Sequence, residues 1–446
     1  MNNTPTTLVA RAREAVPEGT FVVGLGMVIA AAAAYIVVII VNAAVGDKEY
    51  AGFAVFWSLL FIVGPGLFLP LEQEVARAIS ERRANGVGST PLIRKAALLG
   101  GGTCLALIGV SIACSQLIIE HLFHNNPQLL IGFVIGLAGF AVMHLVRGTC
   151  SGNSRFVPYG VMIGAEGVIR LAFVVALAAI GTSSSGPYGI AMGVAPFIAA
   201  LAVLLDRKGL LSTGPTATWS ELSAALALLL AGSVLAQVLA YAALLVVNVL
   251  EGSRDAEIAR SFTNAFFVAR IPVLMFMAVQ AALLPRLARL AASDAHLDFR
   301  TAFKRLLAVV LGVAALGTVV AWTIGPFVGR LLFSPEKFQI SNFDLGVLAA
   351  GSGAFIIGQT IAQALIAMKR YWHVSISLFL GCVAFGVGIA AMPNVHTTLR
   401  ASAAFFAGSL VASVVMLALV QKDLRGPIPE SGLDLVRSIE QEAIDI

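Results

Sequence analysis

The sequence predicts an all-α integral membrane protein with 12 transmembrane helices in two six-helix lobes related by pseudo-two-fold symmetry. The composition, the spacing of apolar runs and a faint internal repeat support this prediction. Of 446 residues, 59% are hydrophobic and only 12% are charged, and the mean hydropathy is +0.92. Because soluble proteins carry about 25% charged residues, the composition indicates a chain that crosses the membrane many times.

Twelve apolar runs are long enough to cross a bilayer, which requires about 20 residues. They span 21–45, 51–70, 96–118, 128–147, 159–180, 186–205, 222–250, 261–284, 306–329, 343–368, 371–392 and 399–420. The first run is too long for the core of a signal peptide and no convincing cleavage site follows it, so we expect a retained helix.

The distribution of Lys and Arg predicts the orientation, because basic residues collect in cytoplasmic loops. With the N-terminus inside, 21 of the 29 basic residues fall on the cytoplasmic side and six on the other side. The remaining two, Arg170 and Arg270, lie within spans. We therefore expect an inner (plasma) membrane protein with both termini in the cytoplasm. The pI near 9.2 is attributed to these loops, and no nucleic-acid partner is expected.

Two short matches predict an internal duplication. "LFLPLEQEVARAI" (67–79) resembles "ALLPRLARLAA" (282–292), which aligns Pro70 with Pro285. "NSRFVPYG" (153–160) resembles "MKRYWHVS" (368–375), which aligns Arg155 with Arg370 at the same offset of 215 residues. A parallel repeat of this kind implies a substrate path between two lobes. The expected divisions are a cytoplasmic N-terminus at 1–20, an N-lobe at 21–206, a cytoplasmic linker at 207–220, a C-lobe at 221–421 and a cytoplasmic tail at 422–446.

The basic stretch "PLEQEVARAISERRANG" after the second span has apolar residues four apart, at Leu71, Val75 and Ile79. This period predicts an amphipathic helix at the membrane surface. One interpretation is that it sets topology and contacts anionic lipid headgroups. The other is a cytoplasmic gate between this stretch and the loop after the eighth span, formed by Glu72, Glu74, Arg77, Arg286 and Arg289.

Ionisable residues are rare inside the spans and usually face the interior of a helix bundle. Glu166 and Arg170 lie four residues apart in "GAEGVIRL", so they share one helix face and pair. This pair either holds helices in register or directs Arg170 towards a cavity. Arg270, in "FFVARIPVLMF", has no carboxylate near it in sequence. Two arginines against one glutamate favour an anionic substrate, and Arg forms bidentate bonds with phosphate oxygens.

Neutral polar residues within the spans are further candidates for the lining of the same path. Each one alone is more often an interhelical hydrogen bond than a ligand contact. They are Tyr35, Asn42, Gln237, Tyr241, Asn248, Gln280, Gln359 and Gln363. The four cysteines have neither disulfide-framework nor metal-ligand spacing, and no Walker A sequence is present. We therefore expect no catalytic residues, no cofactor and no metal.

These features together resemble the multidrug/oligosaccharidyl-lipid/polysaccharide (MOP) exporter superfamily, and most of all its polysaccharide and lipid-linked oligosaccharide flippases. The segments that carry the resemblance are "LEQEVARAISERRANG", "RGTCSGNSRFVPYG", "GAEGVIRL" and "ARIPVLMFMAVQAALLPRLARL". The resemblance implies a V-shaped central cavity that binds a phosphate-linked sugar head and moves it by alternating access. In the lipid II flippase branch an Arg of the eighth helix faces the cavity, and Arg270 resembles it. The arginines that this branch carries in its first two helices have no match here.

The resemblance implies that the chain is a transporter of a lipid-linked glycan precursor rather than an enzyme. Glycosyltransferases or a polymerase of the same pathway are its expected partners, and the chain is expected to be a monomer. One alternative is a multidrug and toxin extrusion (MATE) antiporter, although the first span lacks the acidic residue common in those pumps. Another is a non-transporting scaffold of cell-envelope assembly. A major facilitator transporter is disfavoured because the Gly-x-x-x-Asp-Arg pattern is absent after the second span.

Overall fold

The computed structural model describes residues 19–205, 209–222, 226–271, 296–368 and 370–425, and within these ranges the regular structure is entirely helical. Eleven of the described helices are long and apolar enough to cross a membrane. They are α2 (Thr20–Ala44), α3 (Asp47–Ala84), α4 (Thr90–Ala113), α6 (Pro127–Gly152), α7 (Phe156–Ala179), α8 (Ser185–Leu204), α9 (Leu226–Glu251), α12 (His296–Thr323), α14 (Asn342–Ala367), α15 (Tyr371–Ala391) and α16 (Thr397–Arg425).

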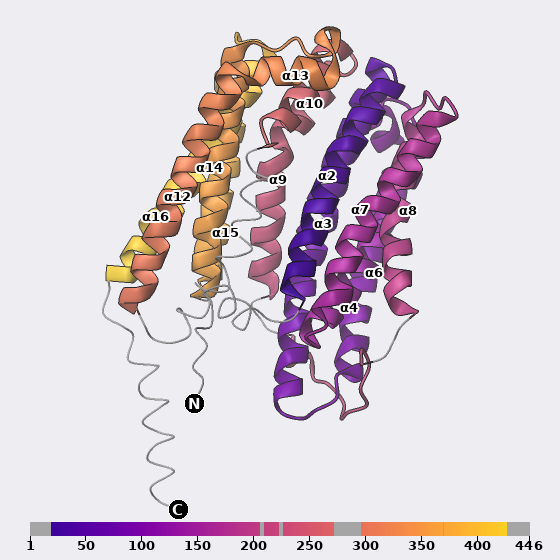
Figure 1. The fold of residues 1–446 in the computed structure, drawn as a ribbon, viewed down its shortest axis with the longest axis vertical. Coiled ribbons are helices and arrows are strands. Elements are labelled where there is room, and N and C mark those ends of the chain that lie inside the picture. Colours follow the sequence, from indigo (N-terminus) through magenta and orange to yellow (C-terminus); the bar gives the residue numbers. More distant parts are fainter. Residues whose placement is uncertain (1–18, 206–208, 223–225, 272–295, 369, 426–446) are drawn as a thin grey trace, which may run out of the picture.

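Shorter helices connect the long ones. They are α5 (Ser115–Leu117), α10 (Ala256–Val268), α13 (Gly325–Phe333), the π-helical turn η1 (Ile118–Leu122) and the 3₁₀ turns η2 (Trp219–Glu221) and η3 (Pro335–Lys337). The predicted eighth span, 261–284, begins in α10 and continues outside the described residues. α10 begins at the end of the bundle where α9 finishes, and α12 begins at the opposite end (Figure 1).

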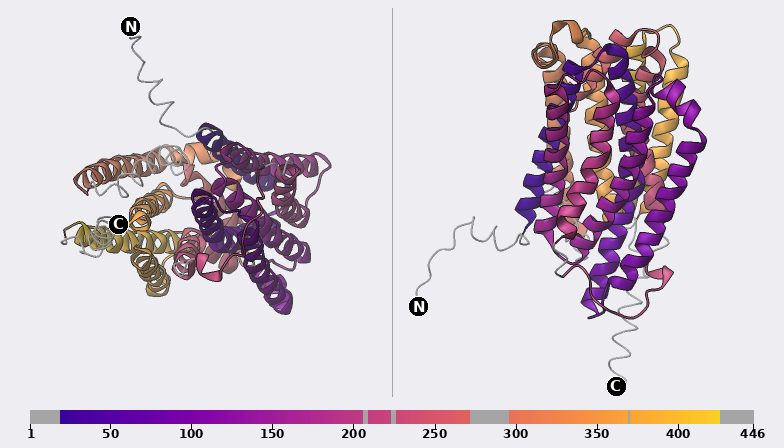
Figure 2. Two further views of the ribbon diagram at one scale, coloured as in Figure 1. Left: turned by 90° about the horizontal axis from the view of Figure 1, so that it is seen from below. Right: turned by 90° about the vertical axis from the view of Figure 1, so that its right-hand side faces the viewer.

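The long helices form two groups that lie side by side (Figures 1 and 2). The same partners pack together in each group: α2 with α7 and α9 with α15, α6 with α8 and α14 with α16, α4 with α6 and α12 with α14. Large apolar side chains such as Leu98 and Leu105 are about 70% exposed on the outside, where lipid is the expected solvent. The two-lobe, all-α membrane fold predicted from the sequence is therefore confirmed.

The internal repeat keeps one register over two consecutive helices. α6 and α14 have the same length, and an offset of 215 residues superposes both of their ends. Arg155 and Arg370 are the N-cap residues of α7 and α15, with similar backbone angles. The Arg155 N–H donates to the Cys150 carbonyl, and the Arg370 N–H donates to the Leu365 carbonyl, both at 2.8 Å. The aligned arginines therefore mark equivalent helix junctions.

The amphipathic stretch after the second span is not a separate surface helix. α3 runs without interruption through Pro65 and Pro70 to Ala84, which extends it well beyond the predicted span of 51–70. Its apolar residues Leu71, Val75 and Ile79 pack against α4 and the linker between the lobes. Their partners in this small cluster include Leu92, Ala96, Ala217 and Leu222. The apolar face of this stretch is therefore buried against protein, and the contact of its basic residues with lipid headgroups stays a prediction.

The described part of the linker, 209–222, is held against the end of α3 by Arg82. The Arg82 Nε donates to Glu221 Oε2 at 2.5 Å, and Nη1 donates to the carbonyl oxygens of Gly88 and Pro215 at 2.7 and 3.2 Å. Arg82 and the backbone N–H of Thr218 hold the pKa of the Glu221 carboxyl at about 2. The contribution of this pair to stability is therefore fully present above the ordinary carboxyl pKa and is lost as pH falls through about 2.

The substitution Arg82→Gln should release the linker at neutral pH. Charge-assisted hydrogen bonds contribute about 2 kcal/mol, so we expect amide hydrogen exchange across 209–222 to accelerate about 30-fold. Arg83→Gln is the matched control, because Arg83 is the next residue of the same helix and is exposed. Equal exchange rates in the two variants would show that Arg82 does not hold the linker.

A polar cluster joins the two lobes at the end of the bundle where α2 finishes and α3 begins. We call it the latch; it comprises Asn42, Val45, Asp47, Tyr50, Arg260, Asn264 and Lys337. Arg260 of α10 is only 1% exposed. Its guanidinium donates to the carbonyl oxygens of Asn42 and Val45, both at 2.7 Å, and pairs with Asp47.

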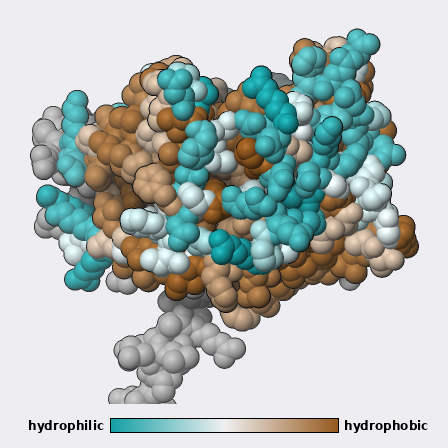
Figure 3. Space-filling model, turned by 90° about the horizontal axis from the view of Figure 1, so that it is seen from above, coloured by the Kyte–Doolittle hydropathy of each residue, from teal (hydrophilic) through white to brown (hydrophobic). Residues whose placement is uncertain are grey.

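Two further residues of the C-terminal lobe complete the latch. The Asn264 amide donates to the Lys337 carbonyl at 2.7 Å and its oxygen accepts from the Tyr50 hydroxyl at 3.0 Å. The Lys337 Nζ donates to the Asn42 carbonyl at 2.9 Å. Figure 3 looks onto this end of the bundle, where hydrophilic side chains spread across the middle of the face. The lobes are therefore closed against each other at this end.

Candidate substrate-binding cavities

A cavity of about 410 Å³ lies between α2, α3, α6, α7, the middle of α9 and the end of α10. We call it the charged cavity, because Glu166, Arg170, Arg270 and Arg147 all line it. The three deep ionisable residues singled out in the sequence are thus brought to one space from both lobes. Tyr35 and Tyr241 line it as well. Its described lining carries three arginines and one glutamate, a net positive charge.

The Glu166–Arg170 pair forms on α7 as the four-residue spacing predicts. Both side chains are buried, at 7% and 4% exposed. The guanidinium carbon of Arg170 lies 5.7 Å from the centre of the Phe61 ring, and its Nε has no hydrogen-bond partner among the described residues. Glu166 therefore occupies only part of the hydrogen-bonding capacity of the Arg170 guanidinium. Its buried Nε–H is a donor that a ligand in the cavity could accept from.

Arg270 follows α10 directly and reaches the cavity from the C-terminal lobe. Its guanidinium carbon lies 4.2 Å from the centre of the Phe266 ring and 5.0 Å from that of Tyr241, and its Nη2 donates to the Ala240 carbonyl. Within the described ranges no carboxylate pairs with it. Aromatic faces and a carbonyl dipole stabilise the cation without neutralising it, so its full charge is available to an anion.

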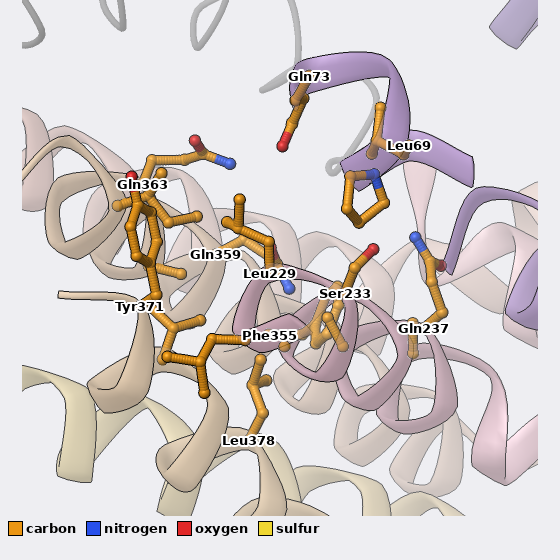
Figure 4. A pocket seen from close by; sticks show the side chains of 18 of the residues that line it. Leu69, Gln73, Leu229, Ser233, Gln237, Phe355, Gln359, Gln363, Tyr371 and Leu378 are labelled. Carbon is orange, nitrogen blue, oxygen red and sulfur yellow. The ribbon is translucent and has the colours of Figure 1, made fainter. Parts of the chain in front are cut away.

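A second cavity of about 220 Å³ lies between α3, α9, α14 and α15. We call it the amide cavity, because four glutamines line it: Gln73, Gln237, Gln359 and Gln363. Ser233 and Tyr371 add hydroxyl groups. Figure 4 shows Gln73 of α3 facing Gln363 of α14 across this space. Tyr241 and Arg270 line both cavities, so the two meet at these residues.

Two of the predicted lining residues lie elsewhere. Asn42 is buried in the latch, where its side-chain oxygen accepts hydrogen bonds from Arg260 and Asn264, both at 3.3 Å. Asn248 is fully buried and its amide donates to the Thr263 hydroxyl at 2.9 Å. Both are structural hydrogen-bonding groups that line neither cavity. Gln280 lies outside the described residues.

The predicted gate residues separate into two sets. Glu74 pairs with Arg77 at 2.6 Å, and Arg77 also donates to the Glu221 carbonyl of the linker at 2.7 Å. Glu72 instead points into the N-terminal lobe and is 4% exposed. Its described partners are His144 and Arg147 on α6 and Tyr159 on α7. Arg286 and Arg289 lie outside the described residues, so the predicted contact with them stays a prediction.

Sequence reasoning missed Arg147 and His144. Arg147 was assigned to a cytoplasmic loop, yet it lines the charged cavity. His144 is 3% exposed and contacts Glu72 with its Nδ1 at 2.6 Å. The sequence did contain one indication: His144 and Arg147 lie three residues apart at the end of an apolar run. This spacing places both on one helix face.

No protein-family model matches the chain. Two proteins of Mycobacterium tuberculosis (strain ATCC 25618 / H37Rv) are similar in sequence. The uncharacterized protein Rv3630 is 27% identical over 420 residues, which cover 90% of this chain and 92% of that protein. The uncharacterized protein Rv1510 is 27% identical over 362 residues, which cover 77% and 78%.

Solved structures are similar over nearly the whole chain. An inward-facing multidrug resistance MATE family transporter of the MOP superfamily has a TM-score of 0.72 at 13% identity, covering 93% of this chain and 98% of that one. The Vibrio cholerae MATE transporter VcmN has a TM-score of 0.70 at 15% identity, with the same coverage. The chain has the MATE fold.

A third solved structure of this fold bears on the charge of the binding pocket. A MOP superfamily transporter from Pyrococcus furiosus, described as having a binding pocket of reverse polarity that suggests a different function, has a TM-score of 0.67 at 14% identity, covering 91% of this chain and 95% of that one. The MATE fold is therefore not tied to one pocket charge. In the present chain, α2 contains no acidic residue, and Glu166 is the one carboxylate in the described lining of the charged cavity.

Proposed function

We propose that the chain is a flippase that moves a lipid-linked oligosaccharide or polysaccharide precursor with an anionic phosphate head from the inner to the outer leaflet. The observation that carries this proposal is the unneutralised Arg270 at the junction of a positively charged cavity and an amide-lined one. Arg270 and Arg170 bind the phosphate oxygens, because guanidinium groups match their geometry and charge. Glu166 orients Arg170 and is a poor proton carrier in that pair.

The amide cavity suits the glycan. Sugar hydroxyls need donors and acceptors close together, and each glutamine side chain offers both. Gln237 on α9 and Gln359 and Gln363 on α14 supply them next to Arg270. A phosphate held at Arg270 would direct the first sugars into this cavity, while the lipid tail stays in the bilayer.

The same fold supports alternating access. The lobes, 21–206 and 221–421, rock about the substrate: the latch opens as the opposite end closes. As part of the same proposal, the chain lies in the cell membrane with both termini in the cytoplasm, and it acts as a monomer that receives substrate from glycosyltransferases of a cell-envelope pathway.

The second candidate is a multidrug extrusion antiporter, favoured by the MATE-fold transporters that the chain resembles. A cationic drug needs an available carboxylate, and the Glu166 carboxylate is already occupied by Arg170. The charge of the described cavity lining therefore favours the anionic substrate.

A binding experiment separates the two candidates. Purified protein in lipid nanodiscs is titrated with geranylgeranyl pyrophosphate and, separately, with ethidium. The variant Arg270→Gln should weaken pyrophosphate binding about 10- to 100-fold, as expected for one buried charge-assisted interaction. Arg254→Gln is the matched control, because Arg254 is exposed and outside the spans. Equal affinity of wild type and Arg270→Gln, or tight binding of ethidium alone, would overturn the proposal.

A further inference from the structure

A buried cluster of four ionisable side chains lies beside the charged cavity. Glu72 of α3 accepts from His144 Nδ1 at 2.6 Å through its Oε2, and the same oxygen lies 3.2 Å from Arg147 Nε. Its other oxygen, Oε1, accepts from the Tyr159 hydroxyl at 2.9 Å. The Arg147 Nη2 donates to that hydroxyl at 3.0 Å. Three helices, α3, α6 and α7, therefore meet at one carboxylate.

His144 has an unused nitrogen in this cluster. With Nδ1 donating to Glu72, the neutral ring presents the lone pair of Nε2, and this atom is buried without a hydrogen-bond partner among the described residues. The ring packs on Phe140 at 5.8 Å between centroids. Nε2 is therefore the atom of this cluster that can take up a further proton without breaking a hydrogen bond, and the Glu72 carboxylate beside Nδ1 stabilises the imidazolium that results.

Few other charged or titratable groups face the Glu72–His144 pair. Arg147 on α6 faces both members of the pair, Tyr159 on α7 faces Glu72, and the Cys150 thiol on α6 also lies near Glu72. In the described ranges Glu72 and His144 make no hydrogen bond or ion pair beyond those given above. The His144 proton therefore acts chiefly on Glu72 and, through it, on Arg147.

Arg147 connects this pair to the cavity. It shares Glu72 Oε2 with His144 and also lines the charged cavity with Arg170. When His144 is neutral, the Glu72 charge is balanced by Arg147. When His144 gains a proton, the imidazolium balances the negative charge of Glu72 in place of Arg147. Arg147 then faces the cavity with its own positive charge uncompensated. One proton at His144 thus adds one positive charge to the wall that would hold an anion.

We propose that the Glu72–His144 pair is a proton-binding site that controls anion binding in the charged cavity by releasing Arg147. This inference rests on the proposed function, because it concerns the same anionic ligand. Proton uptake and anion binding then promote each other to the same degree, as linkage requires. Glu72 and His144 are positioning residues that act through Arg147, and neither needs to touch the ligand.

Isothermal titration calorimetry of geranylgeranyl pyrophosphate tests this coupling. Wild-type protein is titrated between pH 6 and 8 in buffers of different ionisation enthalpy, which gives the protons taken up per ligand. We expect the proton uptake per bound ligand to be greater in wild type than in His144→Gln by at most about one proton. The glutamine amide of this variant keeps the hydrogen bond to Glu72. The affinity of wild type should fall more steeply with rising pH. The control His121→Gln removes an exposed histidine and should behave as wild type.

The outcomes are distinct. Equal proton uptake by wild type and His144→Gln, with binding intact, overturns the inference and leaves the proposed function standing. Absence of binding by wild type overturns both. If His144→Gln fails to fold, histidine ¹⁵N NMR of wild type replaces it: the buried imidazole should titrate between pH 6 and 8, and its signals should shift when ligand is added. An imidazole that does not titrate contradicts the inference.

Discussion

The substitution Arg260→Gln should open the latch. Arg260 is nearly inaccessible to solvent and bonds from α10 of one lobe to Asn42, Val45 and Asp47 of the other. Its guanidinium carbon also lies 5.1 Å from the centre of the Tyr50 ring. Loss of a buried charge from such a network costs about 3 kcal/mol, which shifts the balance between closed and open latch about 100-fold.

Double electron–electron resonance measures this shift. Spin labels at Lys48→Cys and Glu336→Cys report the separation of the lobes at the latch, because both positions are exposed there. Wild type should give a single short distance, and Arg260→Gln should add a longer one. Arg330→Gln, an exposed arginine of α13, should leave the distribution as in wild type. An unchanged distribution in Arg260→Gln would mean that the latch does not hold the lobes.

The substitution Gly132→Ala should destabilise the N-terminal lobe strongly. α6 and α8 approach so closely that a Cβ on Gly132 would lie 2.5 Å from the carbonyl carbon of Gly189 and 2.7 Å from its oxygen. Backbone atoms cannot move aside as side chains do, so the helices must separate, at a cost of about 2 to 3 kcal/mol. Because α6 also carries His144 and Arg147, the separation should disturb the cavity wall.

Thermal unfolding followed by intrinsic fluorescence tests this prediction. Gly102→Ala is the matched control, because a Cβ at Gly102 meets nothing within 4 Å. We expect the control to melt like wild type or slightly higher, since alanine favours helix over glycine, and Gly132→Ala to melt several degrees lower. Melting of Gly132→Ala at the wild-type temperature would show that the α6–α8 approach is loose.

The fold was predictable because its signals are local. Apolar run length marks the spans, and the matched Arg155 and Arg370 mark equivalent junctions between helices. The i, i+4 spacing was sufficient to pair Glu166 with Arg170. The end of the second span was missed, because Leu71 and Val75 are buried by a linker that lies far away in the sequence.

The site was predictable only in part, because the burial of a polar group depends on which helix packs against it. Asn42 and Gln237 look alike in sequence, yet the side chain of Asn42 accepts from Arg260 in the latch and that of Gln237 lines the amide cavity. Arg147 and Arg260 were assigned to loops by their positions at the ends of apolar runs. Both lie against the opposite charges of another helix, Glu72 and Asp47 of α3, which no periodicity within one helix could reveal.

Translocation of a fluorescent lipid-linked oligosaccharide in proteoliposomes tests the central claim, that the cavity carries an anionic lipid-linked glycan held by Arg270. The account predicts that wild type and Arg254→Gln move the lipid between leaflets at equal rates. It predicts that Arg270→Gln is slower by about 10-fold or more, in line with the loss of one buried charge-assisted contact. Equal rates for wild type and Arg270→Gln, or efflux of ethidium without movement of the lipid, would contradict it.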